Sequence, residues 1–131
     1  MNLHARKGKV IRMNMENEIS QFASEFVSCQ KILTAIGDET RQHLILEMMQ
    51  MESCEGARVG SITERTSLSR PAVSHHLQIL KDAGIIKMRR EGTKNYYYFD
   101  TDMEAFEKLI NMLQHARAIT QQLPDRSGEN E

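Results

Sequence analysis

The stretch RPAVSHHLQILKDAGIIKMRREGTKNYYYF, residues 70–99, decides how this chain folds. Its first half predicts a helix, because apolar or weakly polar positions recur at steps of three and four residues and form one stripe that faces a core: Val73, His76, Leu77 and Leu80. Ser69 suits the N-cap, and Pro71 lies in the first turn, where a missing N–H costs little. Gly84 suits the C-terminal end of the same helix.

The segments around this helix also show regular patterns. A shorter helix over Ser61–Thr66 precedes it, followed by a turn over Ser67–Ser69. The residues after it predict a β-hairpin whose tip is Glu91–Lys94, where Gly92 supplies the positive φ of a tight turn. Alternation in the return strand places Tyr97 and Phe99 on one face and Tyr96 and Tyr98 on the other, and spacing alone leaves open which pair is buried.

This order of helix, turn, helix and basic hairpin is typical of a protein that places one helix in the major groove of DNA and braces a loop on the phosphates. Ser74, His75 and Gln78 lie opposite the apolar stripe and carry short donors and acceptors that suit base edges. We expect Arg70 to assist them and the hairpin to hold phosphate. The predicted DNA-binding residues are Ser69, Arg70, Ser74, His75, Gln78, Arg89, Arg90, Thr93, Lys94 and Tyr96.

Two simpler interpretations stay open for these residues. The polar face of the second helix is also what an ordinary amphipathic surface helix presents to water. The basic residues Arg89, Arg90 and Lys94 would also protect a strand edge from pairing with another chain, and this role is compatible with phosphate contact.

The distribution of charge supports a nucleic-acid partner although the formal net charge is only −1. Residues 58–98 hold eight Lys or Arg against three acids, and residues 1–12 hold four bases and no acid. The segments between and after them are acidic. A basic region between acidic flanks directs DNA to one face, and its binding should weaken steeply with salt.

At residues 69–86 and 89–98 the chain resembles the ArsR/SmtB family of small winged-helix repressors, and residues 32–41, ILTAIGDETR, resemble the family's entry to its second helix. The resemblance covers about residues 20–120. It implies a mainly α fold with a small β-hairpin, a winged helix-turn-helix in the order α-α-α-α-β-β-α. It also implies a homodimer that occupies a promoter-overlapping operator and releases it when an inducer binds.

The flanking segments predict scaffold helices and a dimer interface. The first helix follows three- and four-residue steps through Ile19, Phe22, Phe26, Cys29, Leu33 and Ile36, and the next is capped by Asp38 and runs to about Met51. The last, about Asp102 to Leu123, has an apolar stripe broader than a small monomer easily covers. The predicted interface residues are Phe22, Phe26, Phe106, Leu109, Ile110, Leu113 and Ala116.

Symmetry and segment composition complete the predicted organisation. Two-fold symmetry would place the recognition helices ~34 Å apart on a near-palindromic double-stranded operator. We divide the chain into a flexible basic segment, 1–15, a DNA-binding and dimerisation domain, 16–123, and a polar tail, 124–131.

The sequence argues against the metal sites that are familiar in this family. Many relatives carry metal-binding cysteines at the start of the first helix of the helix-turn-helix pair. The equivalent stretch of this chain, about residues 58–64, has no cysteine. Spacing on the terminal helix matches Asp102, Glu104, His115 and Ala118 to the zinc ligands of other relatives, a weak set because one position is a methyl group. We therefore predict no metal and no cofactor, and the inducer is unassigned.

The two cysteines, Cys29 and Cys54, lie in different surroundings. Cys29 lies on an apolar stripe and is expected to be a buried, inert thiol, whereas Cys54 lies among carboxylates that would raise its pKa. A thiol- or metalloid-responsive repressor that uses Cys29 and Cys54 stays an alternative.

Two other classes of protein are compatible with a small domain of this size. An enzyme is not expected, since no nucleophile–base pair, phosphate-binding glycine loop or carboxylate pair is evident. A winged-helix protein–protein module without DNA affinity is the remaining alternative, although it would have no reason to keep the basic hairpin. With no apolar leader, no membrane span and few cysteines, we expect a cytoplasmic protein without membrane partners.

Overall fold

A computed structural model of the 131-residue chain describes residues 3–51 and 55–128, with side chains from residue 14 onward. Two compact units divide the chain. We call Cys29–Leu109 the head unit, and Met1–Ser28 together with Ile110–Glu131 the helical unit.

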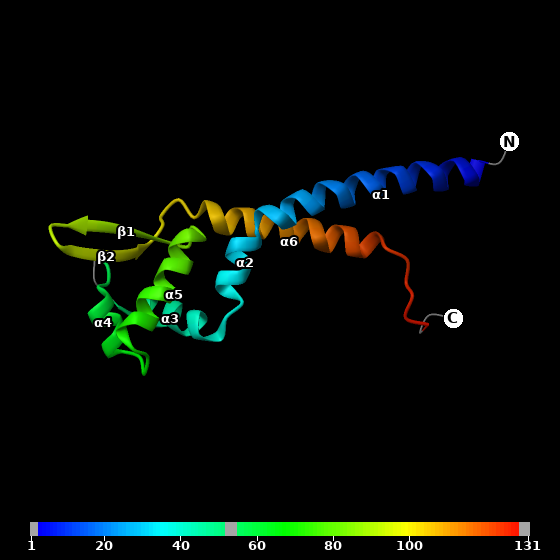
Figure 1. The fold of residues 1–131 in the computed structure, drawn as a ribbon. Helices are drawn as coiled ribbons and strands as arrows, with labels where there is room; N and C mark the ends of the chain where they lie inside the picture. Colours follow the sequence, from blue (N-terminus) through cyan, green and yellow to red (C-terminus); the bar gives the residue numbers. More distant parts are fainter. Residues whose placement is uncertain (1–2, 52–54, 129–131) are drawn as a thin grey trace. The chain divides into compact units, whose positions relative to one another are not determined.

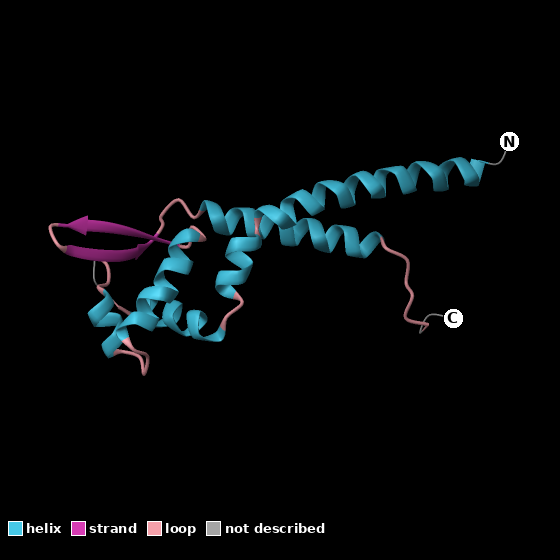
Figure 2. Cartoon of the chain, in the orientation of Figure 1, coloured by secondary structure: helices cyan, strands magenta, loops and turns pink. Residues whose placement is uncertain are grey.

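The head unit contains four complete helices and the only strands among the described residues. Figure 1 labels these elements, and Figure 2 colours them by secondary structure. In chain order they are α2 (Gln30–Ile36), α3 (Glu39–Gln50), α4 (Val59–Glu64), α5 (Arg70–Asp82), β1 (Ile86–Glu91) and β2 (Lys94–Phe99), after which α6 (Glu104–Gln122) begins. The helix α5 contacts α2, α4 and β1. This is the mainly helical winged helix-turn-helix that the sequence predicts.

The core of the head unit forms where these helices meet the start of the hairpin. Each element contributes the side chains that its periodicity turns inward, and their removal from water stabilises the unit. The largest fully buried ones are Leu44 of α3, Ile62 of α4, Val73, Leu77 and Leu80 of α5, and Ile85 and Ile86 at the start of β1.

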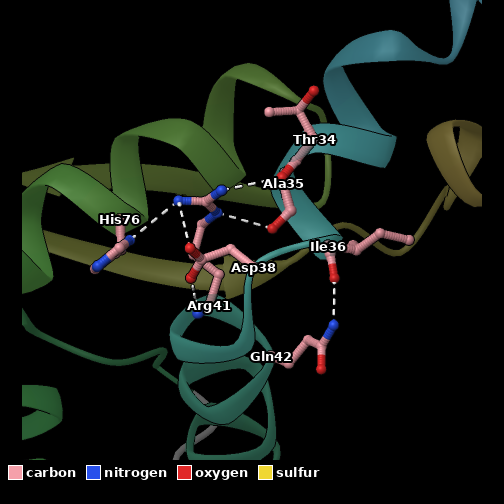
Figure 3. Close-up of polar contacts among 7 residues, drawn as sticks. All are labelled: Thr34, Ala35, Ile36, Asp38, Arg41, Gln42 and His76. Atoms are coloured by element: carbon pink, nitrogen blue, oxygen red, sulfur yellow. Dashed lines mark hydrogen bonds and ion pairs between the residues drawn. The ribbon is translucent and has the colours of Figure 1, made fainter.

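Polar side chains of α3 satisfy the end of α2 (Figure 3). Asp38 caps α3 by accepting from the Arg41 backbone N–H at 3.0 Å. The Arg41 side chain donates through Nε to the carbonyl of Ala35 at 2.8 Å and through Nη2 to that of Thr34 at 3.0 Å. Gln42 donates to the carbonyl of Ile36 at 2.6 Å. Carbonyls that a helix end normally leaves unpaired are thus bonded by side chains of the next helix.

The hairpin forms where the sequence predicts it, with its turn within Glu91–Lys94. Ile86 pairs with Phe99 and Glu91 with Lys94, so the tip consists of two residues, Gly92 and Thr93. Gly92 has a φ of +62°, the positive value that the first residue of a type II′ turn requires.

On β2 only Tyr97 is buried, and Phe99, which shares its predicted face, is half-buried. Tyr97 is 8% exposed, whereas Tyr98 is half-buried and Tyr96 is also only partly covered. Tyr97 also exchanges two backbone hydrogen bonds with Ala57, at 2.7 and 2.8 Å, which anchors the strand beside the segment that leads into α4.

The predicted first helix is wrong in its extent. The segment forms two helices, α1 (Leu3–Ser28) and α2, separated at Cys29. The buried residues of α2 are Ile32 and Ala35, whereas Leu33 and Ile36 of the predicted stripe are not buried. The helix α1 begins within the segment 1–15 that we expected to be flexible, and the proposed division of the chain into three parts stays a prediction.

The helical unit contains α1 and the part of α6 from Ile110 onward. Phe22 of α1 contacts Phe26 edge-on, with ring centroids 5.5 Å apart, and contacts the ring of His115 in the same way at 5.9 Å. Within the described ranges, no helix is long and apolar enough to cross a bilayer.

Candidate nucleic-acid interface

The helix α5 separates a buried face from a polar face that stays accessible. Val73, Leu77 and Leu80 are buried, whereas Ser74, His75 and Gln78 lie on the opposite side. The amide group of Gln78 donates to Asp82 one turn later at 2.9 Å, which holds this side chain along the helix surface. The face that we predicted to meet base edges is therefore open to a partner.

Both ends of α5 are formed by the residues that the sequence indicates. The Ser69 hydroxyl oxygen accepts from the backbone N–H of Ala72 at 3.3 Å, and Pro71 lies in the first turn. Gly84 has a φ of +80°. The backbone N–H groups of Gly84 and Ile85 donate back to Lys81 and Leu80, the Schellman arrangement that commonly ends a helix. We call α5 the recognition helix and the β1–β2 hairpin the wing.

The arginines of the wing differ in how they are held. Arg89 donates to Glu91 at 2.9 Å and to the Glu55 carbonyl at 2.7 Å, and its guanidinium lies 5.1 Å from the centroid of the Tyr96 ring. Arg90 is exposed and donates through Nε to the carbonyl of Gly92 at 3.1 Å. Since its terminal nitrogens form no hydrogen bond or ion pair within the described residues, Arg90 is the better placed of the two to bind phosphate.

Lys87 contributes to the structure of the wing base. It forms an ion pair with Asp100 at 3.0 Å and lies 4.0 Å from Asp102. The hydrogen bond to Asp100 raises the pKa of Lys87, and the pKa of Asp100 is lowered by the Asp102 backbone N–H and then by Lys87. Part of the positive charge counted from the sequence is therefore already paired.

All ten predicted DNA-binding residues lie on the recognition helix, its N-cap or the wing, and none of them is buried. They are Ser69, Arg70, Ser74, His75, Gln78, Arg89, Arg90, Thr93, Lys94 and Tyr96. Their contact with DNA stays a prediction.

The helix before the recognition helix starts earlier than expected. The helix α4 spans Val59–Glu64 rather than Ser61–Thr66. The Thr63 hydroxyl bonds the carbonyl of Val59 at 2.7 Å, and the Thr66 hydroxyl oxygen accepts from the backbone N–H of Leu68 at 3.2 Å. Thr63 thus bonds within α4, whereas Thr66 bonds within the turn that follows it and belongs to that turn.

The side chains weighed as metal ligands have other partners. Asp102 lies near Lys87, and Glu104 lies 3.6 Å from Lys108. Throughout the part of the chain that the structure describes, no group of three His, Cys, Asp or Glu residues is arranged to hold an ion. Cys29 is 1% exposed, as expected for a core thiol, and Cys54 lies outside the described residues.

His115 is held by two carboxylates of α1, an arrangement that the sequence did not reveal. Its Nδ1 lies 2.7 Å from Glu25 and its Nε2 lies 2.6 Å from Glu18. Because carboxylates only accept, both ring nitrogens must carry hydrogen, and the imidazolium form is favoured. The two hydrogen bonds, that to Glu25 first, raise the pKa of His115 above its ordinary value.

The raised pKa of His115 predicts a stability that depends on pH. The stabilisation is complete below pH 6.5, the ordinary histidine pKa, and is lost as pH rises through the higher pKa of the folded state. We expect the thermal unfolding midpoint to fall modestly from pH 6.5 upward in the natural chain and less in His115→Gln. A His43→Gln control, at an exposed histidine, should follow the natural chain, and an unchanged slope in His115→Gln would contradict the assignment.

The predicted dimer residues differ in exposure. Phe26, Ile110 and Leu113 are exposed to 46%, 51% and 53%. Phe22, Phe106 and Ala116 are half-buried, and Leu109 is buried. The exposed members are large apolar groups on α1 and α6, and their role in a dimer stays a prediction.

Comparison with known proteins identifies the family. The family described as "Bacterial regulatory protein, arsR family" matches residues 38–88, which include α3, α4, the recognition helix and part of β1. The chain is 36% identical to an HTH-type transcriptional regulator of Methanocaldococcus jannaschii, over 68% of this chain and 98% of that protein. The chain belongs to the ArsR family.

The chain is also similar to a named repressor and to a dimeric DNA-binding domain. The chain is 37% identical to the transcriptional repressor SdpR of Bacillus subtilis, over 53% of this chain and 73% of SdpR. A homodimeric winged helix-turn-helix DNA-binding domain from Mycobacterium bovis has the same fold, with a TM-score of 0.54 and 20% identity, over 79% of this chain and 93% of that one. ArsR proteins are transcriptional regulators and not enzymes, so this chain is a DNA-binding transcriptional regulator.

Proposed function

We propose that this ArsR-family regulator is a homodimeric repressor that binds a near-palindromic operator and leaves it when a small inducer binds. The observation that carries the proposal is the accessible Ser74, His75 and Gln78 face of the recognition helix in the same compact unit as the basic wing. The likeness to SdpR supports repression, and the dimeric M. bovis domain supports two-fold symmetry.

The proposed contacts divide into two kinds. On the recognition helix, Ser74, His75 and Gln78 meet base edges with help from Arg70, and the helix start at Ser69 lies against the backbone. On the wing, Arg90 and Lys94 bind phosphate together with Thr93. Arg89 and Tyr96 complete the proposed phosphate-binding set, with the Arg89 guanidinium 5.1 Å from the centroid of the Tyr96 ring.

The dimer is proposed to form through the exposed apolar side chains of α1 and α6, including Phe26, Ile110 and Leu113. Covering such residues by a second copy removes apolar surface from water, and a two-fold axis then repeats the recognition helix along one face of the duplex. Sedimentation equilibrium tests this step, since a monomer at micromolar concentration would contradict it. A cytoplasmic location is proposed with it.

Two substitutions test the division between base and phosphate contacts. We expect Arg90→Ala to weaken binding to all duplexes and to reduce the salt slope by about one unit, because one phosphate contact is lost. We expect His75→Ala to remove about 1–3 kcal/mol of discrimination between duplexes, with little change in the salt slope.

Fluorescence anisotropy measures both effects. One labelled duplex is selected from a randomised pool by the natural protein, and the other is an unselected random duplex, each titrated at two salt concentrations. Absent or salt-insensitive binding to both duplexes would favour a protein–protein module over a DNA regulator. Equal losses on both duplexes for both variants would contradict the division of roles.

A further inference from the structure

Arg41 joins three elements of the head unit at one buried point. Two guanidinium nitrogens bond the carbonyls of Thr34 and Ala35 at the end of α2, and the third, Nη1, lies 3.2 Å from Nδ1 of His76 on the recognition helix (Figure 3). The Arg41 residue is 8% exposed. The planar fork of a guanidinium serves several acceptors in fixed directions, which a lysine ammonium does not do. The recognition helix is therefore linked by a polar contact to the corner between α2 and α3.

The chemistry of this contact fixes the protonation state of His76. A guanidinium has donors and no acceptor, so Nδ1 of His76 must accept. The ring is then neutral, with its proton on Nε2. If Nδ1 gained a proton, two N–H groups and two positive charges would face each other, and the contact would become repulsive.

The surroundings of His76 favour the same neutral state. Burial is the largest cause that lowers the pKa of His76, and the positive charge of Arg41 is the next. The other groups that act on the ring are Asp38 at the N-cap of α3, which raises the pKa, and His75 of the same helix, which lowers it. The end of α2 presents the carbonyls of Thr34 and Ala35, which Arg41 occupies.

We propose that Arg41 is a positioning residue that sets the recognition helix through His76, and that protonation of His76 breaks this contact and lowers selectivity for the operator. This inference rests on the proposed function and adds a condition, protonation of His76, under which selective binding to the operator is lost. His76 is not among the residues assigned to DNA, so its effect is exerted through the placement of Ser74, His75 and Gln78.

The sign of the pH response separates this proposal from simple electrostatics. Acidification adds positive charge to histidines, which strengthens binding to any duplex through the phosphates. A positioning role predicts that the ratio of selected to random affinity falls instead. This affinity ratio begins to fall below pH 6.5, because the pKa of His76 lies below its ordinary value. Below the pKa of His76 the ratio falls by up to about tenfold for each pH unit, since one proton must leave the ring before the contact can form.

The test compares affinities for the selected and random duplexes at pH 7.5 and 5.5 in the 131-residue protein. In His76→Gln a neutral amide oxygen accepts from Arg41 at both pH values, so we expect near-natural selectivity at pH 7.5 and no fall at pH 5.5. In His76→Leu the acceptor is absent, and we expect about tenfold lower selectivity already at pH 7.5. The matched control is His43→Gln, an exposed histidine of α3 that should keep the natural profile.

The outcomes distinguish this inference from the proposed function. No selective binding at pH 7.5 by the natural protein would overturn the proposed function. Selective binding whose pH profile is the same in His76→Gln and the natural protein would overturn only the role of His76. Should either variant fail to fold, nitrogen-15 NMR of the natural protein decides, because a proton on Nδ1 of His76 at pH 7.5 excludes the contact and a proton on Nε2 supports it.

Discussion

Replacing Leu77 by alanine is expected to lower the free energy of unfolding by about 2–5 kcal/mol, the range for deleting a fully buried leucine side chain. Leu77 is 0% exposed and lies on the inner face of the recognition helix, opposite the residues assigned to DNA. Because the lost side chain leaves a cavity under that helix, selective DNA binding should decrease with stability. Urea unfolding followed by circular dichroism measures the first effect, and anisotropy titration the second.

The chain offers a matched control in Leu46. This leucine lies on α3 and is 57% exposed, so the same substitution removes few contacts. We expect Leu46→Ala to change the free energy of unfolding by no more than about 0.5 kcal/mol. Similar losses in the two variants would show that Leu77 is not part of the core.

The second large effect is expected at Gly56, where the wing meets the segment before α4. Gly56 has a φ of +98°, and a Cβ atom there would lie 2.8 Å from the carbonyl oxygen of Tyr97. The next residue, Ala57, forms the two backbone hydrogen bonds with Tyr97. We expect Gly56→Ala to cost at least about 1–3 kcal/mol through backbone strain and to weaken those two bonds as well. Urea unfolding and amide exchange at Ala57 and Tyr97 measure the change.

Two other glycines separate strain from crowding. Gly92 also has a positive φ, but a Cβ atom added there would meet no neighbouring atom within 4 Å, so Gly92→Ala should cost only about 1–2 kcal/mol. Gly60 lies in α4 with open space and no positive φ, and Gly60→Ala should stabilise the chain by about 0.4–1 kcal/mol. An equal cost at Gly56 and Gly92 would show that the Tyr97 carbonyl does not crowd the first position.

The recognition helix and wing were predictable because their signals are local. A cap at Ser69, an apolar stripe, a terminating glycine and a two-residue turn at Gly92 each act within a few residues, and together they define the element bounds. The exposed face of the helix follows from the same periodicity.

The break at Cys29 was not predictable in the same way. Apolar residues continue across it at helical spacing, and neither glycine nor proline marks it. The phase changes there, so that Ile32 and Ala35 are buried in place of Leu33 and Ile36. Which face of a helix is buried after such a break depends on tertiary packing, and the spacing of apolar residues alone does not determine it.

Two polar pairs between helices were missed because they join distant positions in the sequence. Arg41 and His76 are 35 residues apart, and His115 and Glu25 are 90 apart. Charge counting placed Arg41 in an acidic segment, and spacing on the terminal helix singled out His115 only as a position matched to zinc ligands. The contacts of Arg41 and His115 depend on which helices are neighbours in space. A single sequence does not give that information.

Because Cys29 is buried, the reactivity of its thiol reports on local opening of the fold around it. A thiol that is 1% exposed reacts with an alkylating reagent only in moments when the surrounding helices separate. In a chain whose other cysteine, Cys54, is replaced by serine, the alkylation rate therefore reports how readily the start of α2 opens. The rate can be compared with and without DNA, and its probe is a thiol that the chain already carries.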